Sequence, residues 1–176
     1  MKKLISIVLC AVMGLSMAAC GGSSASASAK EYNLDDIVSA VEAVNPVSNP
    51  REVDELALEN EFMMSADSGV AYKGELSNDQ GNSAQIMAVQ CADGKADDVK
   101  KALETYQQNQ IAYYGNYAEF ADGQALIKDG RIVEKGNYVV LVFANTDGAS
   151  YTDIDKALSD VTAAIRKQYD NEQAKQ

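Results

Sequence analysis

The chain contains no histidine and no tryptophan, and only two prolines and three cysteines among its 176 residues. Without histidine, the usual serine–histidine–aspartate and cysteine–histidine catalytic groups and imidazole metal sites are excluded. Basic residues are also scarce, with 15 Lys and Arg against 26 Asp and Glu and a net charge of -11. Because neutralising phosphates needs clustered cations, we expect no nucleic-acid partner. The composition therefore predicts a non-enzymatic protein with no cofactor and no metal site.

The N-terminal segment has the pattern of a targeting signal. A basic start is followed by a mostly apolar stretch at 4–17, which is too short for a permanent membrane-spanning helix. Ala18, Ala19 and Cys20 come next, and they resemble a bacterial lipobox, in which the signal is removed before a cysteine that receives lipid. We predict a lipoprotein signal peptide at 1–19, cleavage between Ala19 and Cys20, and lipidation of Cys20. The alternatives are a plain secretory signal and an uncleaved helix.

The next residues, 20–30, combine the lipidated cysteine with a flexible linker of Gly, Ser and Ala. We expect a domain anchored to the cell membrane, facing outside the cytoplasm. An acidic domain is repelled by an anionic membrane surface, so the anchoring comes from the acyl chains on Cys20. After cleavage Cys91 is the only free thiol, which excludes an intramolecular disulfide. We interpret Cys91 as a small buried strand residue, the alternative being a nucleophile.

Hydrophobic periodicity predicts alternating helices and hairpins in one domain at 31–169, followed by a polar tail at 170–176. The segment at 118–128 is either a short helix or an irregular turn. The last strand is apolar on both faces, which is typical of a central strand. The predicted helices are 34–44, a short 52–59, a long one from Asp97 to about Tyr117, and a last one from Ser150 or Thr152; the predicted strands are 69–76, 84–91, 131–134 and 138–144.

This order predicts an α+β fold. We expect an antiparallel four-stranded sheet built from two β-hairpins, with helices packed on one face, in the order α-(α)-β-β-α-β-β-α. The two strand–strand–helix units have similar lengths, which suggests an internal duplication, although no matching residues support it.

One end of the long predicted helix holds the candidate ligand or partner site. Gln110 is the one polar residue in the middle of the apolar face, and Tyr113, Tyr114 and Tyr117 follow it. Phenols stack on sugars and donate hydrogen bonds, which favours a ligand site. The alternative is that these tyrosines pack the core with their hydroxyls at its rim. Gln110 either is hydrogen-bonded in the core or lines a cleft.

Other motifs have ordinary structural explanations. The loop at 77–83 is rich in turn residues but lacks the ligand spacing of an EF-hand. No phosphate-binding glycine motif is present. Paired carboxylates of the kind used by glycosidases occur only where helices begin, where acids cap backbone N–H groups; these pairs are Asp35 with Asp36, Asp97 with Asp98, and Asp153 with Asp155.

Several diffuse motifs carry a family resemblance over roughly 35–165: the segment 97–103 opening the long helix, Gln110, Tyr117, Gly136 and Tyr138. With the lipobox and linker, they make the chain resemble an uncharacterised lipoprotein family, domain of unknown function 4358, of Gram-positive bacteria of the clostridial group. The resemblance implies an envelope location and an α+β fold. It implies no activity and no catalytic residue.

Two functions follow from these features. The first is a membrane-tethered, non-enzymatic interaction or accessory domain with an unknown envelope protein as partner. The alternative is a lipoprotein that binds a small ligand or a cell-wall fragment. Two-lobed solute receptors are about twice this length or more, so a cleft would have to form within a single domain.

Overall fold

A five-stranded antiparallel sheet organises the chain, in the order β1-β2-β3-β5-β4. The computed structural model describes residues 32–64, 69–148 and 150–175, so the predicted signal peptide, cleavage site, Cys20 and linker lie outside the described residues. The strands are β1 (Pro50–Glu52), β2 (Gly69–Ser77), β3 (Gln85–Cys91), β4 (Arg131–Lys135) and β5 (Tyr138–Phe143). The helices are α1 (Leu34–Glu42), α2 (Glu55–Asn60), α3 (Ala96–Tyr114), the 3-10 turn η1 (Ala118–Phe120), α4 (Ala121–Lys128) and α5 (Tyr151–Gln173).

The two predicted hairpins are present, and they join through their inner strands. β2 pairs with β3, β4 pairs with β5, and β3 pairs with β5, for example through Ala88 and Val140. The α+β class and the antiparallel sheet are therefore confirmed. α5 continues to Gln173, so the predicted polar tail begins inside this helix.

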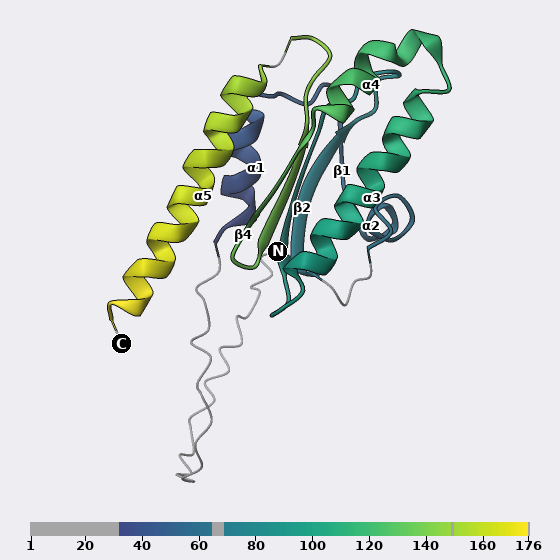
Figure 1. Ribbon diagram of the computed structural model, residues 1–176. Coiled ribbons are helices and arrows are strands. Elements are labelled where there is room, and N and C mark those ends of the chain that lie inside the picture. Colours follow the sequence, from purple (N-terminus) through teal and green to yellow (C-terminus); the bar gives the residue numbers. More distant parts are fainter. Residues whose placement is uncertain (1–31, 65–68, 149, 176) are drawn as a thin grey trace, which may run out of the picture.

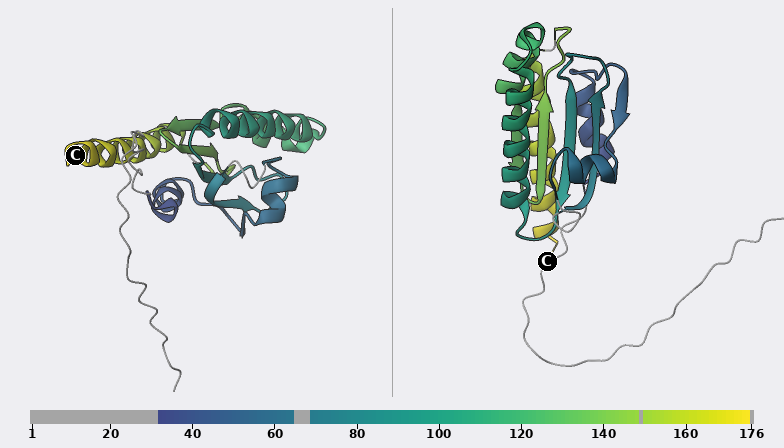
Figure 2. Two further views of the ribbon diagram at one scale, coloured as in Figure 1. Left: turned by 90° about the horizontal axis from the view of Figure 1, so that it is seen from below. Right: turned by 90° about the vertical axis from the view of Figure 1, so that its right-hand side faces the viewer.

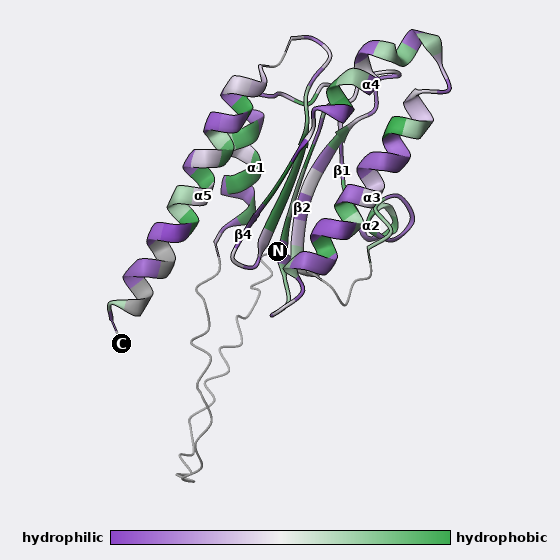
Figure 3. Cartoon of the chain, in the orientation of Figure 1, coloured by the Kyte–Doolittle hydropathy of each residue, from purple (hydrophilic) through white to green (hydrophobic). Residues whose placement is uncertain are grey.

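Helices cover both faces of the sheet, not one face as the sequence predicted. α1 and α5 lie on one side, and α2, α3 and α4 on the other (Figures 1 and 2). The reason lies in β3 and β5, every residue of which is buried. Side chains alternate between the two faces of a strand, so apolar residues on both faces require a cover on each. Figure 3 shows this hydrophobic central region between the helices.

Each face has its own core. Towards α3, Met87, Val89 and Leu141 pack with Leu103 and Phe62. Towards α1 and α5, the alternate residues of the same strands form the second cluster, which is made of Ile86, Ala88, Val140 and Val142 with Ile37, Val41, Ile154 and Leu158. The fold is a three-layer arrangement held by two hydrophobic clusters.

The strand missing from the prediction is β1, which makes five strands in place of four. It has three residues and begins with Pro50, in a stretch that the sequence predicts to be a connector. Proline cannot donate a backbone hydrogen bond, so it occurs at the start of a strand or on an edge. Only pairing with β2, through Arg51 and Leu76 among others, makes this segment a strand.

The two edges of the sheet are short or flanked by charges. β1 is one edge, and β4 is the other. Arg131 of β4 pairs with Asp155 of α5 at 2.6 Å, and Glu134 pairs with Lys100 of α3 at 3.7 Å. Short strands, proline and charged side chains are the features that discourage pairing with another chain.

Within the described part of the chain, none of the helices combines the length and the apolar character needed to cross a membrane.

Three asparagines link the turn after α1, the β2–β3 loop and the end of β5; we call Asn45, Asn82 and Asn145 the asparagine clasp. The fully buried Asn45 donates through Nδ2 to the Phe143 carbonyl at 2.9 Å and accepts at Oδ1 from the Asn145 N–H at 2.8 Å. Its amide thereby pairs with the end of β5 as a neighbouring strand would. Asn145 donates to the Pro46 carbonyl at 2.7 Å and accepts from Asn82 at 3.2 Å.

We predict that Asn45→Ala lowers the free energy of unfolding by about 3 kcal/mol, because it leaves a buried carbonyl and a buried N–H without partners. Chemical denaturation would measure the loss. Asn60→Ala is the control, since Asn60 is exposed and its side chain bonds, among the described residues, to Leu56 of its own helix. A loss no larger than that of Asn60→Ala would contradict the prediction.

Candidate functional site

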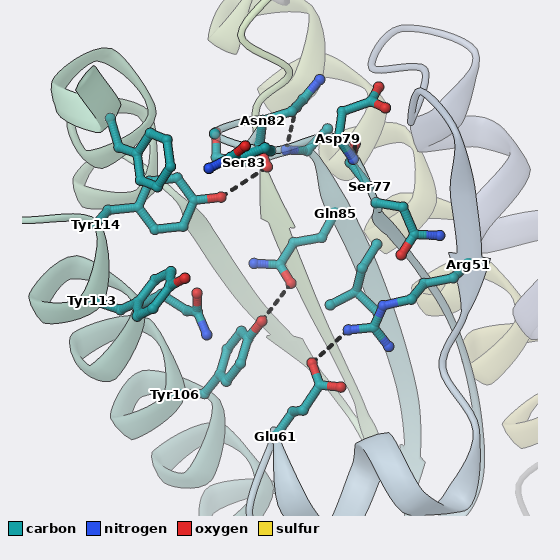
Figure 4. A pocket seen from close by; sticks show the side chains of 17 residues that line it. Arg51, Glu61, Ser77, Asp79, Asn82, Ser83, Gln85, Tyr106, Tyr113 and Tyr114 are labelled. Carbon is teal, nitrogen blue, oxygen red and sulfur yellow. Dashed lines mark hydrogen bonds and ion pairs between the residues drawn. The ribbon is translucent and has the colours of Figure 1, made fainter. Parts of the chain in front are cut away.

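A groove of about 420 Å³ lies between α3 and the β2–β3 loop, at 78–84 (Figure 4). α3 forms one wall and the loop forms the other. The side chain of Gln85, at the start of β3, lies between the walls. The residues used below are Arg51, Glu61, Asp79, Asn82, Gln85, Tyr106, Gln110, Tyr113 and Tyr114, all of which line the groove.

The α3 wall contains three of the four predicted site residues. Gln110, Tyr113 and Tyr114 line the groove, and the side chain of Gln110 has no hydrogen-bond partner among the described residues. Tyr113 is 53% exposed. Tyr114 is half-buried and donates its hydroxyl to the Asn82 carbonyl at 2.8 Å. Burial raises the pKa of the Tyr114 phenol, so the hydroxyl keeps the proton that it donates.

Tyr117 does not line the groove. α3 ends at Tyr114, so Tyr117 lies in the turn beyond the helix. Its ring contacts Tyr113, with centroids 5.6 Å apart, and Phe120, at 5.2 Å. Tyr117 therefore supports the groove wall from behind.

The floor is a buried hydrogen-bonded pair. Tyr106 donates its hydroxyl to Oε1 of Gln85 at 2.8 Å. Its ring stacks on Phe62 at 4.3 Å, so the core fixes its position, and burial raises the pKa of its phenol. Gln85 is only 5% exposed, and its Nε2 donates to no described residue. This amide nitrogen is an unused donor at the base of the groove.

The charged groups of the groove are one cation and two carboxylates. Arg51 of β1 pairs with Glu61 at 2.6 Å at one end. Asp79 on the loop accepts hydrogen bonds from Ser48 at 2.6 Å and Asn49 at 3.2 Å. Because Arg51 is already neutralised, the groove favours neutral or cationic ligands over anions.

Close glycine contacts hold the loop wall in place. Gly81 has a φ of +79°, and a Cβ there would lie 3.0 Å from the ring of Phe120. A Cβ on Gly123 of α4 would lie 2.8 Å from the ring of Tyr114 and 2.9 Å from the Gly81 carbonyl. The absence of side chains at both positions lets α4, Tyr114 and the loop pack together.

Sequence reasoning missed most of the polar groove residues: Arg51, Glu61, Asp79, Asn82 and Gln85. Arg51 is placed by a strand that the sequence does not signal. Gln85 did carry a signal, since it is a polar residue at the start of a strand that is otherwise mostly apolar.

The groove offers hydrogen-bonding groups and aromatic contact. In residues 32–64, 69–148 and 150–175, no three His, Cys, Asp or Glu side chains are grouped so as to hold a metal ion. Cys91 is buried outside the groove, and burial raises the pKa of its thiol to about 11, which keeps it protonated at neutral pH.

Fold and groove together define a three-layer α+β domain with a polar, aromatic-walled groove. The chain belongs to the family described as Domain of unknown function (DUF4358), whose model matches residues 43–144. The match is shorter than the resemblance at 35–165 suggested, but it includes every residue that lines the groove. No curated protein and no solved structure matches the chain.

We predict that Gly123→Ala displaces Tyr114 and the loop and destabilises the protein by about 1–3 kcal/mol, because its Cβ meets a ring and a backbone carbonyl. Near-ultraviolet circular dichroism of the tyrosines and chemical denaturation would detect the two effects. Gly115→Ala is the control: its nearest contact is the flexible end of Gln124, which can move away, so the loss should be smaller. An equal loss in both variants would contradict this assignment.

Proposed function

We propose that this protein is a non-enzymatic binding domain, anchored by lipid on Cys20 to the outer face of the cytoplasmic membrane of a Gram-positive bacterium. The groove is its binding site. The observation that carries the proposal is the set of unused groups in the groove: the exposed ring of Tyr113 and the amides of Gln110 and Gln85, which donate to no described residue. Binding is favoured when a ligand supplies hydrogen-bond partners to polar groups that are partly removed from water and have no partner.

The position of the first described residues supports an outward-facing groove. Tyr32 precedes α1, and its ring contacts Tyr138 with centroids 6.3 Å apart, next to the β4–β5 turn. The β2–β3 loop lies at the opposite end of the sheet (Figure 1). A tether that enters at Tyr32 would therefore attach at the end of the domain opposite the groove, which leaves the groove accessible. The occupant is then a component of the envelope beyond the membrane.

The groove is a cleft within a single small domain, so binding of a small ligand does not require two lobes. Its volume of about 420 Å³ lies within the range of about 300–1,000 Å³ for small-ligand sites. This observation favours a small ligand or a segment of a cell-wall polymer over a broad, flat contact with an envelope protein.

We predict that Cys20→Ala abolishes labelling of the protein by a palmitate analogue in growing cells and releases it from washed membranes. The reason is that the acyl chains are the proposed anchor, and two of them are needed for stable attachment. Cys91→Ala is the matched control and should keep both the label and the membrane association. Membrane association that survives Cys20→Ala would argue against the lipid anchor.

We predict that a photo-crosslinking residue at Gln80, on the exposed rim of the groove, forms an adduct in living cells that Tyr113→Ala reduces by about tenfold. The same crosslinker at Ser159, exposed on α5, is the control and should give no such adduct. If Gln80 yields no adduct, or one that is insensitive to Tyr113, the groove is not the binding site.

A further inference from the structure

The unused amide donor of Gln85 on the groove floor indicates which functional group a ligand needs there. Oε1 of Gln85 accepts the Tyr106 hydroxyl at 2.8 Å, which leaves Nε2 as the free end of the amide. Its Nε2 then faces the groove without an acceptor from the described residues (Figure 4). Gln85 is only 5% exposed, yet its Nε2 is not fully enclosed, so this donor can be reached from the groove. A ligand with a carbonyl oxygen at this depth would satisfy it.

In the groove wall, the aromatic ring of Tyr113 is positioned by neighbouring rings but remains exposed. The ring of Tyr113 is inclined by 71° to Tyr114 and by 61° to Tyr117, with centroids 5.9 and 5.6 Å away. Neither neighbour stacks parallel to it, and the side chain is 53% exposed. Such a ring can stack against a flat ligand that has C–H groups on one face and polar groups at its edge.

The other polar groups of the groove suit hydroxyls. Glu61 and Asp79 are acceptors, whereas Arg51 and Gln110 carry donors, and all four line the same groove. Phosphates and carboxylates would meet two carboxylates and an arginine that is already paired. A neutral ligand with several hydroxyls fits this mixture of donors and acceptors.

A peptide fits the groove less well than a sugar. Peptides bind in extended form to free strand edges or insert side chains into apolar pockets. Beside the groove, β2 is paired on both sides, by β1 at Glu75–Ser77 and by β3, and offers no free edge there. The apolar side chains of Leu76 in β2 and Ala84 in the loop are buried.

We infer that the groove binds a neutral N-acetylated sugar of a glycan chain, with the sugar face on Tyr113 and the acetamido carbonyl accepting a hydrogen bond from Nε2 of Gln85. Gln110, Glu61 and Asp79 meet the hydroxyls. This inference rests on the proposed function, to which it adds the chemical class of the ligand.

The test is calorimetric titration of the whole chain, purified in detergent, with the β-1,4-linked tetramer of N-acetylglucosamine. We expect saturable binding that is about tenfold tighter than binding of the matching tetramer of glucose, which lacks the acetamido carbonyl. Tyr113→Ala should weaken binding about tenfold, while Tyr113→Phe should keep most of it, because the ring face remains. Gln85→Glu, which replaces the donor by an acceptor, should remove the preference for the acetylated tetramer.

Gln108→Ala is the matched control, since Gln108 is exposed on the same helix, α3, and does not line the groove, and this variant should bind the tetramer nearly as tightly as the original chain. Circular dichroism of every variant would verify that it is folded. Three results would overturn the inference: no saturable binding, equal binding of the two tetramers, or binding that is unchanged by Tyr113→Ala. Tighter binding of a blocked, uncharged alanine tetrapeptide would assign the groove to peptides instead.

The sugar titration and the crosslinking at Gln80 separate the two proposals. If the acetylated tetramer does not bind while the Tyr113-dependent adduct forms in cells, the ligand class is wrong and the groove is still the binding site. If both fail, the proposed function fails with it.

Discussion

The buried amide of Asn45 is the contact on which the upper end of this protein depends. It bonds to the Phe143 carbonyl and to the Asn145 N–H, where β5 ends and no further strand residue is available. Asn145 in turn accepts a hydrogen bond from the side chain of Asn82, and the backbone carbonyl of Asn82 accepts one from the hydroxyl of Tyr114. One fully buried side chain thus links the turn after α1, the last core strand and the groove wall. A buried polar network of this kind is stable only when its members are satisfied, so it tolerates few alternative positions of the loop.

The groove exists because the two faces of the sheet are covered differently. On one face α1 and α5 pack over the central strands, and the second core cluster closes beneath them. On the other face α3 covers one part of the sheet, and α2, which has only six residues, covers part of the remainder. Between α3 and the β2–β3 loop, the helices cover the sheet incompletely. There the hydrophobic core ends at the hydrogen-bonded side chains of Tyr106 and Gln85. The binding site is therefore continuous with the hydrophobic core, which fixes the position of its floor.

The elements that could be predicted from the sequence are those whose pattern is local. The apolar run of β5, the hairpins and the long helix α3 were all predicted, because hydrophobic periodicity and turn residues determine them. β1 was missed since its three residues become a strand only against β2. The position of Gln110 and Tyr113 on one helix face was predictable for the same local reason. Among their companions, Arg51 was not predictable, because it reaches the groove only through the pairing of β1 with β2, whereas Gln85 carried a local signal that was not used.

The charged and shortened edges of the sheet gain importance if the chain is concentrated on a membrane. Tethered molecules share a thin layer, where collisions between neighbours are frequent and orientations are similar. Under those conditions an open strand edge would seed edge-to-edge growth of sheets across the surface. Pro50 at one edge, and the Arg131–Asp155 and Lys100–Glu134 pairs at the other, work against such growth. The same protein can then be packed densely in two dimensions and still present each groove as that of a separate molecule.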